Sequence, residues 1–122
     1  MLQQVEDMLN TLVSGIKNVS KLDDLLTSPE GVLQLNGICM CLLVVGEELK
    51  KIDQRTNKQL LSQYPNIPWR EVMGMRDKIA HHYFEIDVDI VSDIIYSDIP
   101  PLIVTIQQII KDLTKNIDME IS

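Results

Sequence analysis

Apolar residues recur at steps of three and four along most of this chain, with polar residues between them. In residues 2–19 the recurring positions are Leu2, Val5, Leu9, Leu12, Val13 and Ile16. After Pro100-Pro101 they are Leu102, Ile106, Ile109, Leu113 and Ile117. This period of about 3.6 residues is typical of α-helices that bury one face. The pattern therefore predicts an all-α fold.

The second long segment predicts a helix from Pro29 to about Thr56, after a short turn at residues 21–26. Ser28 can cap this helix, Pro29 suits its first position, and Glu30 complements its dipole. Its middle, Ile38 to Val45, is apolar all round. We expect this central helix to be buried on every side and to touch a second subunit.

The rest of the chain predicts shorter elements, joined by loops that prolines bracket. Pro65 and Pro68 bracket one loop, and Pro100-Pro101 is predicted to end one helix and start the last. The expected elements are a helix or turn over 57–64, a helix over Trp69–Tyr83, a helix over Val88–Tyr96 capped by Asp87, and a frayed tail from about Asn116. Together they predict one domain, residues 1–122, built as an up-and-down bundle of about five to six helices.

Composition bears on the partners of this fold. The 122 residues are 45% hydrophobic and 4% aromatic, and the formal net charge is −7. An acidic chain repels phosphate, which counts against general nucleic-acid binding unless the basic residues gather in one place. Basic side chains do gather in one stretch of the sequence: Arg70, Arg76, Lys78, His81 and His82.

The cysteines and the apolar runs indicate the compartment. Cys39 and Cys41 lie in an apolar setting two positions apart, so we expect both to be reduced thiols in the core. A zinc site that combined them with His81 and His82 would not match the usual spacing of zinc ligands. The longest apolar run has eight residues, whereas a membrane span needs about 20. No signal peptide is visible. We therefore expect a cytoplasmic protein with no membrane partner.

The candidate chemistry lies in one stretch, Met75 to Phe84, which holds both histidines. Histidine exchanges protons near neutral pH, and arginine presents a planar fork of donors that suits phosphate. Arg76, His81 and Tyr83 fall within eight residues. These are the side chains that phosphoryl chemistry uses.

The longer string around these residues resembles the HEPN superfamily. The matching string is Tyr64-Pro65-x-Ile67-Pro68-Trp69-Arg70-Glu71-x-x-Gly74-Met75-Arg76, followed by His81-x-Tyr83-Phe84, Asp87 and Ile90-Val91. Its nearest group is the HepT-like branch, the toxin halves of HEPN/MNT toxin–antitoxin pairs, and the resemblance covers roughly residues 2–113.

The resemblance implies a small helical twofold dimer that cleaves RNA without a metal or cofactor. Arg76 and His81 would be catalytic, and a cognate MNT-type nucleotidyltransferase antitoxin would silence the protein by transferring AMP to Tyr83. Gly46-Glu47 after an aliphatic run also resembles the family pattern. Glu47 is therefore a candidate neighbour of the site, although a solvated surface glutamate is the more ordinary interpretation.

Helical geometry restricts how these residues meet. At about 100° per residue, Tyr83 returns to within about 20° of Arg76, whereas His81 diverges from it by about 140°. Either the helix distorts before His81, or a twofold dimer brings the two residues together. Asp77, four positions before His81, could orient its imidazole, and His82 is expected to be an accessory or surface residue.

Two functional hypotheses remain open. In the first, the chain is a metal-independent endoribonuclease and its substrate is RNA. In the alternative, it is a non-catalytic helical dimer that acts as partner or substrate of a nucleotidyltransferase. The non-catalytic roles are ordinary ones: Arg76 could pair with Asp77 or a glutamate, His81 could be a hydrogen-bonded structural residue, and Tyr83 could be core packing.

Overall fold

The computed structural model describes the backbone of residues 2–17, 19, 21–81 and 87–121. The side chains at 76, 80, 81 and 116–121 are not among those it describes. The elements in order are α1 (Leu2–Gly15), η1 (Leu22–Thr27), α2 (Pro29–Arg55), η2 (Leu61–Gln63), α3 (Trp69–His81), α4 (Val88–Asp93), η3 (Ile94–Asp98) and α5 (Ile99–Ile121). Within the described residues every element is helical, which confirms the predicted all-α class.

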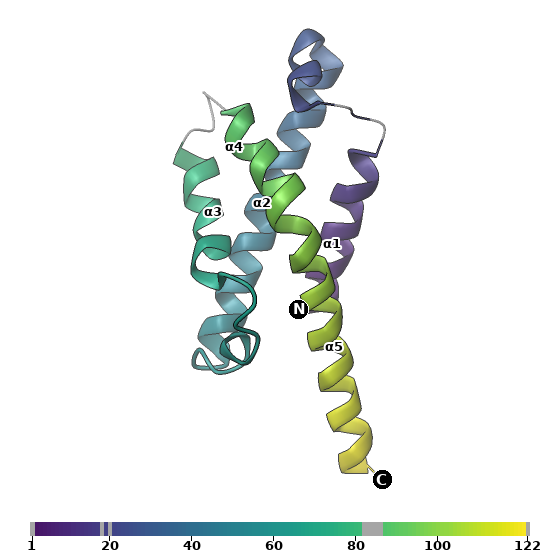
Figure 1. Cartoon of the computed structure of the whole chain (residues 1–122), viewed down its shortest axis with the longest axis vertical. Helices are drawn as coiled ribbons and strands as arrows, with labels where there is room; N and C mark the ends of the chain where they lie inside the picture. The colour runs from purple at the N-terminus through teal and green to yellow at the C-terminus, as the bar shows by residue number, and fades with distance from the viewer. Residues whose placement is uncertain (1, 18, 20, 82–86, 122) are drawn as a thin grey trace.

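Helix α2 is the centre of the bundle. It packs against α1, α3 and η1, while α5 packs against α1. Figure 1 shows α3 running antiparallel to α2, and α5 extending well beyond the other helices. The predicted cap is confirmed, because the Ser28 hydroxyl accepts a hydrogen bond of 3.0 Å from the Gly31 amide.

The start of α2 is held very close to η1. Gly31 is buried, and a Cβ atom at this position would collide with the backbone carbonyl of Leu25. Leu22 and Leu25 of η1 are buried in the same core. The absence of a side chain at Gly31 therefore sets the distance between these two elements.

The first helix is shorter than predicted. It ends at Gly15 rather than at residue 19, and Val13, assigned to its inward stripe, is exposed. Glycine loses more backbone entropy in a helix than other residues, so it is a natural end point. The buried stripe consists of Val5, Leu9 and Leu12.

The proline pair does not separate two helices, contrary to the sequence prediction. The chain from α4 passes through a π-helical turn, η3, directly into α5, with Pro100 and Pro101 in its first turn. Figure 1 shows one continuous ribbon over this region. The predicted start of the last helix at this pair is confirmed, because α5 begins at Ile99 and both prolines lie in its first turn, where a missing N–H costs least.

The last helix keeps its backbone conformation to Ile121, whereas the sequence predicted fraying from about Asn116. Leu102, Ile106 and Ile109 are fully buried, as the stripe predicts. Leu113 is exposed, because this part of α5 has passed the end of the bundle (Figure 1). The helical spacing of apolar residues in α5 therefore continues beyond the part of the helix that packs in the core.

The middle of α2 is less buried than predicted. Within one copy of the chain, Met40 and Val44 are exposed, and Cys41 and Leu43 are half-buried. By length and composition α2 could cross a membrane, with a mean hydropathy of 1.6 over 18 residues of which 39% are buried. The sequence argument counted only unbroken apolar runs and missed this. The core helix of a helical bundle passes the same test, so it carries little weight.

Candidate functional site

The loop before α3 fixes where that helix begins. The Trp69 indole N–H donates to the Tyr64 carbonyl at 2.9 Å. The Tyr64 hydroxyl donates to Asp112 of α5 at 2.6 Å, and the Asn66 amide donates to the Thr105 hydroxyl at 3.0 Å. Most of the Tyr64–Trp69 string thus joins the start of α3 to α5.

The contact between Tyr64 and Asp112 also sets the protonation of both groups. The hydrogen bond to the Asp112 carboxylate, together with burial, raises the pKa of Tyr64 to about 12. The same bond, with a second one from Gln108, lowers the pKa of Asp112. The tyrosine therefore stays a neutral donor and the aspartate a charged acceptor across the neutral range.

Helix α3 is a regular α-helix from Trp69 through His81. Val72, Met75 and Ile79 are buried along its inner face, as predicted. Because the backbone reaches His81 without a 3₁₀ or π turn, the proposed distortion before His81 does not occur. The directions of Arg76 and His81 from the helix axis therefore differ by about 140°. His82 and Tyr83 lie outside the described residues.

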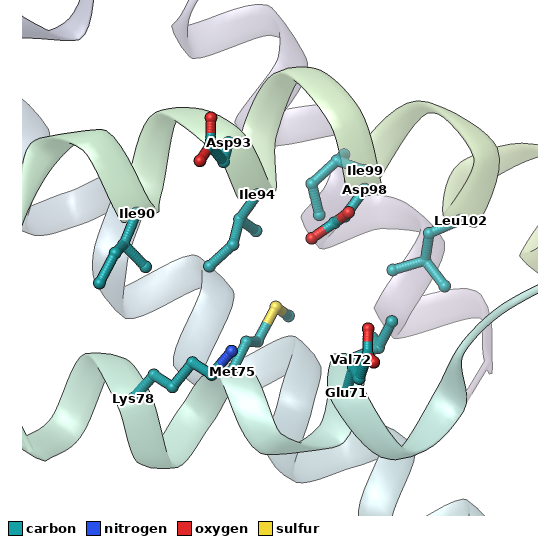
Figure 2. Close-up of a pocket in the computed structure, with 10 residues that line it drawn as sticks. All are labelled: Glu71, Val72, Met75, Lys78, Ile90, Asp93, Ile94, Asp98, Ile99 and Leu102. Carbon is teal, nitrogen blue, oxygen red and sulfur yellow. The ribbon is translucent and has the colours of Figure 1, made fainter.

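The inner face of α3, at Val72 and Met75, also borders a pocket of about 210 Å³ beneath α4, η3 and the start of α5. Figure 2 shows Met75 and Lys78 rising from α3 towards Ile94, with Asp93 and Asp98 on the facing ribbon. Lys78 is two positions from Arg76, or about 200° around the helix. Lys78 lines this pocket, on the side of the helix away from position 76.

The pocket is predominantly acidic at its rim. The pocket wall shields the Asp98 carboxyl from part of the solvent, and this partial burial raises its pKa; repulsion from Glu71 and Asp93 raises it further, while Lys78 opposes the shift. A raised carboxyl pKa means that the folded protein holds this proton more tightly than the unfolded chain. The ionised form of Asp98 therefore costs stability at neutral pH.

Replacing Asp98 with asparagine is expected to raise the free energy of unfolding at pH 7, because it removes that repulsion. The side chain is exposed, so the gain should stay within about 0.5 kcal/mol. This gain in stability should disappear as the pH falls below the ordinary aspartate pKa, where Asp98 is protonated in both the folded and the unfolded protein. Urea unfolding of both proteins at pH 7 and pH 3.5 measures this, and an equal gain at the two pH values would contradict it.

Two further predicted site residues lie on the facing helices. Glu47 of α2 is half-buried and its Oε2 atom is shielded from solvent, so it does not belong to a solvated face. The exposed charge in this region is Lys51, whose ammonium lies 3.4 Å from the half-buried Glu48 carboxylate. Asp77 lies on the exposed side of α3. Glu47 is therefore the more protected of the two candidate carboxylates.

The cysteines behave as the sequence predicts. Both are free thiols, Cys39 is buried and Cys41 half-buried, and burial raises the pKa of each. Among the side chains that the structure describes, no three histidine, cysteine, aspartate or glutamate residues converge on one point.

The chain matches one protein family over most of its length. The model of the HepT-like family, described as ribonuclease HepT-like, matches residues 5–109. This range includes all of α3 and the string that precedes it. No solved structure matches the chain significantly.

Curated relatives from archaea and a bacterium match parts of the chain. A Methanocaldococcus jannaschii protein provisionally named an RNase is 41% identical over 76 residues, 62% of each chain. A Thermococcus cleftensis protein named probable ribonuclease HepT is 37% identical over 65 residues, 53% of this chain and 56% of that one. A Caldanaerobacter subterraneus protein, also provisionally named an RNase, is 27% identical over 100 residues, 82% of each chain. The matched stretch spans between 56% and 62% of three M. jannaschii relatives.

Proposed function

This chain belongs to the HepT-like ribonuclease family, and we propose that it is a metal-independent endoribonuclease, the toxin of a HEPN/MNT toxin–antitoxin pair. The family match over residues 5–109, which includes α3, is the observation that carries the proposal. The residues assigned to catalysis are Arg76 and His81. The protein would act on RNA in the cytoplasm.

The reaction uses the 2′-hydroxyl of the RNA as nucleophile. One histidine removes the 2′ proton while the 2′ oxygen bonds to the phosphorus, and the bond from phosphorus to the 5′ oxygen breaks. Another protonated group gives its proton to the leaving 5′ oxygen. Arg76 stabilises the charge on the phosphoryl oxygens in the transition state. The products are a 2′,3′-cyclic phosphate and a 5′-hydroxyl, and DNA, which has no 2′-hydroxyl, is not cleaved.

The site is proposed to form between two copies of the chain. A straight α3 directs Arg76 and His81 about 140° apart, so a single helix does not aim both at one phosphate. A twofold axis would duplicate each residue and set Arg76 of one copy beside His81 of the other. Asp77 and Glu47 are then positioning candidates, and His82 is an accessory group.

Control of the enzyme is assigned to Tyr83. A partner nucleotidyltransferase would transfer AMP to its hydroxyl, forming a phosphodiester and releasing pyrophosphate from ATP. The added phosphate would then lie beside Arg76 and repel RNA, by the electrostatic logic of phosphorylation. The position of Tyr83, seven residues after Arg76 in the His-x-Tyr pattern, supports this assignment.

A non-catalytic role has two observations in its favour. The chain has a formal net charge of −7, and Lys78 lines a pocket that carboxylates also line. Both features weaken attraction for RNA. In this second hypothesis the helical dimer is only the partner or substrate of the nucleotidyltransferase.

Mixing two inactive variants tests the shared site. Arg76→Ala and His81→Ala are each expected to be inactive, because each removes one group from every site. After subunit exchange, half of the dimers carry both variants, and one of their two sites is intact. Activity should therefore return to about a quarter of wild type in an equimolar mixture. A mixture that stays inactive although mass spectrometry shows heterodimers would contradict a site built from both copies.

A further inference from the structure

One face of α2 is apolar and uncovered along its N-terminal half. Leu33, Met40 and Val44 are 73%, 51% and 36% exposed, and Gly37 is also exposed. Steps of four, three and four residues place these four positions on a single line along the helix. We call Leu33, Gly37, Met40 and Val44 the α2 stripe. Such a face on a central helix indicates an interaction surface.

The shape of the stripe is complementary to itself. Met40 projects from it, and one turn earlier Gly37 leaves a hollow, since a Cβ atom there would meet nothing within 4 Å. Gly37 also lies at the edge of a shallow, apolar groove of about 300 Å³ between α1 and α2, lined by Leu12, Ile38 and Cys41. A projecting side chain and a matching hollow on one helix are what a twofold contact requires.

We infer that a second copy of this chain docks antiparallel on the α2 stripe, about a twofold axis between Ile38 and Cys39. In this register Met40 of each copy packs over Gly37 of the other. Leu33 of each copy packs against Val44 of the other. The inference deepens the proposed dimeric ribonuclease, because it names the contact face and the register.

Charge favours a second copy over another occupant. Residues 31–46 of α2 contain no charged residue, although 24% of the whole chain is charged. Two chains of net charge −7 repel each other, and this repulsion is weakest where both contacting surfaces are uncharged, as along residues 31–46. A basic partner would instead be drawn to acidic surfaces such as the rim formed by Glu71, Asp93 and Asp98.

The register also agrees with a site shared between copies. A twofold axis in the plane of the contact keeps equivalent flanks of the two α2 helices on the same side. The two copies of α3 would therefore line one side of the interface. Because α3 runs antiparallel to α2 (Figure 1), its end at His81 points towards the N-terminal half of α2, where the stripe lies.

Light scattering tests the contact without any assay of RNA. The wild-type chain should have twice its 13.9 kDa mass at tens of micromolar, whereas Met40→Glu should be a monomer. Gly37→Leu, which fills the hollow, should weaken association at least tenfold. Val104→Glu, at an exposed position of α5, is the matched control and should remain a dimer. Circular dichroism checks that each variant is folded.

Cysteine cross-linking tests the register. In a Cys41→Ser background, a short bismaleimide should link Leu33→Cys in one chain to Val44→Cys in another far faster than either variant links to itself, because the helix rise would set two like positions about 16 Å apart along the contact. Faster linking of each variant to itself would indicate parallel helices and contradict the register. A monomeric wild type, a dimer that both stripe variants preserve, or a monomer that co-sediments with phosphatidylcholine–phosphatidylglycerol vesicles would overturn the contact.

RNA cleavage by the same samples separates this inference from the proposed activity. A dimer that the stripe variants disrupt, but that cuts no RNA, would support the contact and overturn the proposed ribonuclease activity. A monomer that cuts RNA would overturn the contact and leave the ribonuclease in place.

Discussion

Replacing His81 with alanine is expected to lower the rate of RNA cleavage by about 10²–10⁴-fold, the usual contribution of a general acid or base. The residue is assigned a proton transfer at the 2′ or the 5′ oxygen, and alanine can perform neither. Single-turnover cleavage of one labelled RNA at saturating protein measures the chemical step directly.

The adjacent histidine provides the matched control. His82→Ala removes an identical side chain one position further on, and it should stay within about tenfold of wild type. Both variants should keep the mass and helical content of the parent protein. Equal losses in the two variants, or an unchanged rate in His81→Ala, would contradict the assignment of His81.

The largest expected effect on stability comes from Gly31→Ala. The new Cβ would collide with the carbonyl of Leu25, a backbone atom that cannot rotate away. Relief of this collision requires η1 and the start of α2 to separate. The free energy of unfolding should therefore fall by about 1–3 kcal/mol, the usual cost of overpacking. Urea denaturation at pH 7 measures this change.

A second helical glycine gives the matched control. At Gly74 of α3 an added Cβ would meet nothing within 4 Å, so Gly74→Ala should be neutral or stabilise by up to about 1 kcal/mol. If both variants lost the same stability, the loss would reflect alanine in general rather than the contact with Leu25. The close approach of η1 would then not be the cause.

Local signals in the sequence predicted much of the fold. Ser28 starts α2, Asp87 caps α4 through the amides of Asp89 and Ile90, and Trp69 starts α3. Each of these signals acts within one turn, so it can be recognised without knowing what packs nearby. The passage through Pro100-Pro101 was mispredicted, because proline is compatible with both a break and a first turn.

Long-range contacts were not predictable in the same way. The Tyr64 hydroxyl bonds to Asp112, which is 48 positions away, and no periodicity links the two. Lys78 was grouped with Arg76 because they are neighbours in sequence, yet 200° of helix rotation separates them. Met40 and Val44 have core-like residue types, but only the packed bundle shows that the described part of the chain leaves both exposed.

The candidate site shows the same difference between local signals, which the sequence reveals, and long-range contacts, which it does not. The string from Tyr64 to Trp69 was recognised through its resemblance, but the structure gives its residues a physical role in anchoring α3 to α5. The pocket bordered by Asp93 and Asp98 was missed, because its walls come from two segments of the chain that the sequence separates. A cluster of acidic residues at positions 87–98 was the only available signal.

Cleavage of a mixed cellular RNA pool by the purified wild-type protein in EDTA tests the central claim most directly. Intact mass should first show that Tyr83 carries no AMP, whose addition would raise the mass by about 329 Da by the composition of an adenylyl group. The account predicts cleavage that leaves 2′,3′-cyclic phosphate ends and that His81→Ala does not produce. No cleavage by the unmodified wild-type protein, with its dimer intact, would contradict the account and favour the non-catalytic partner.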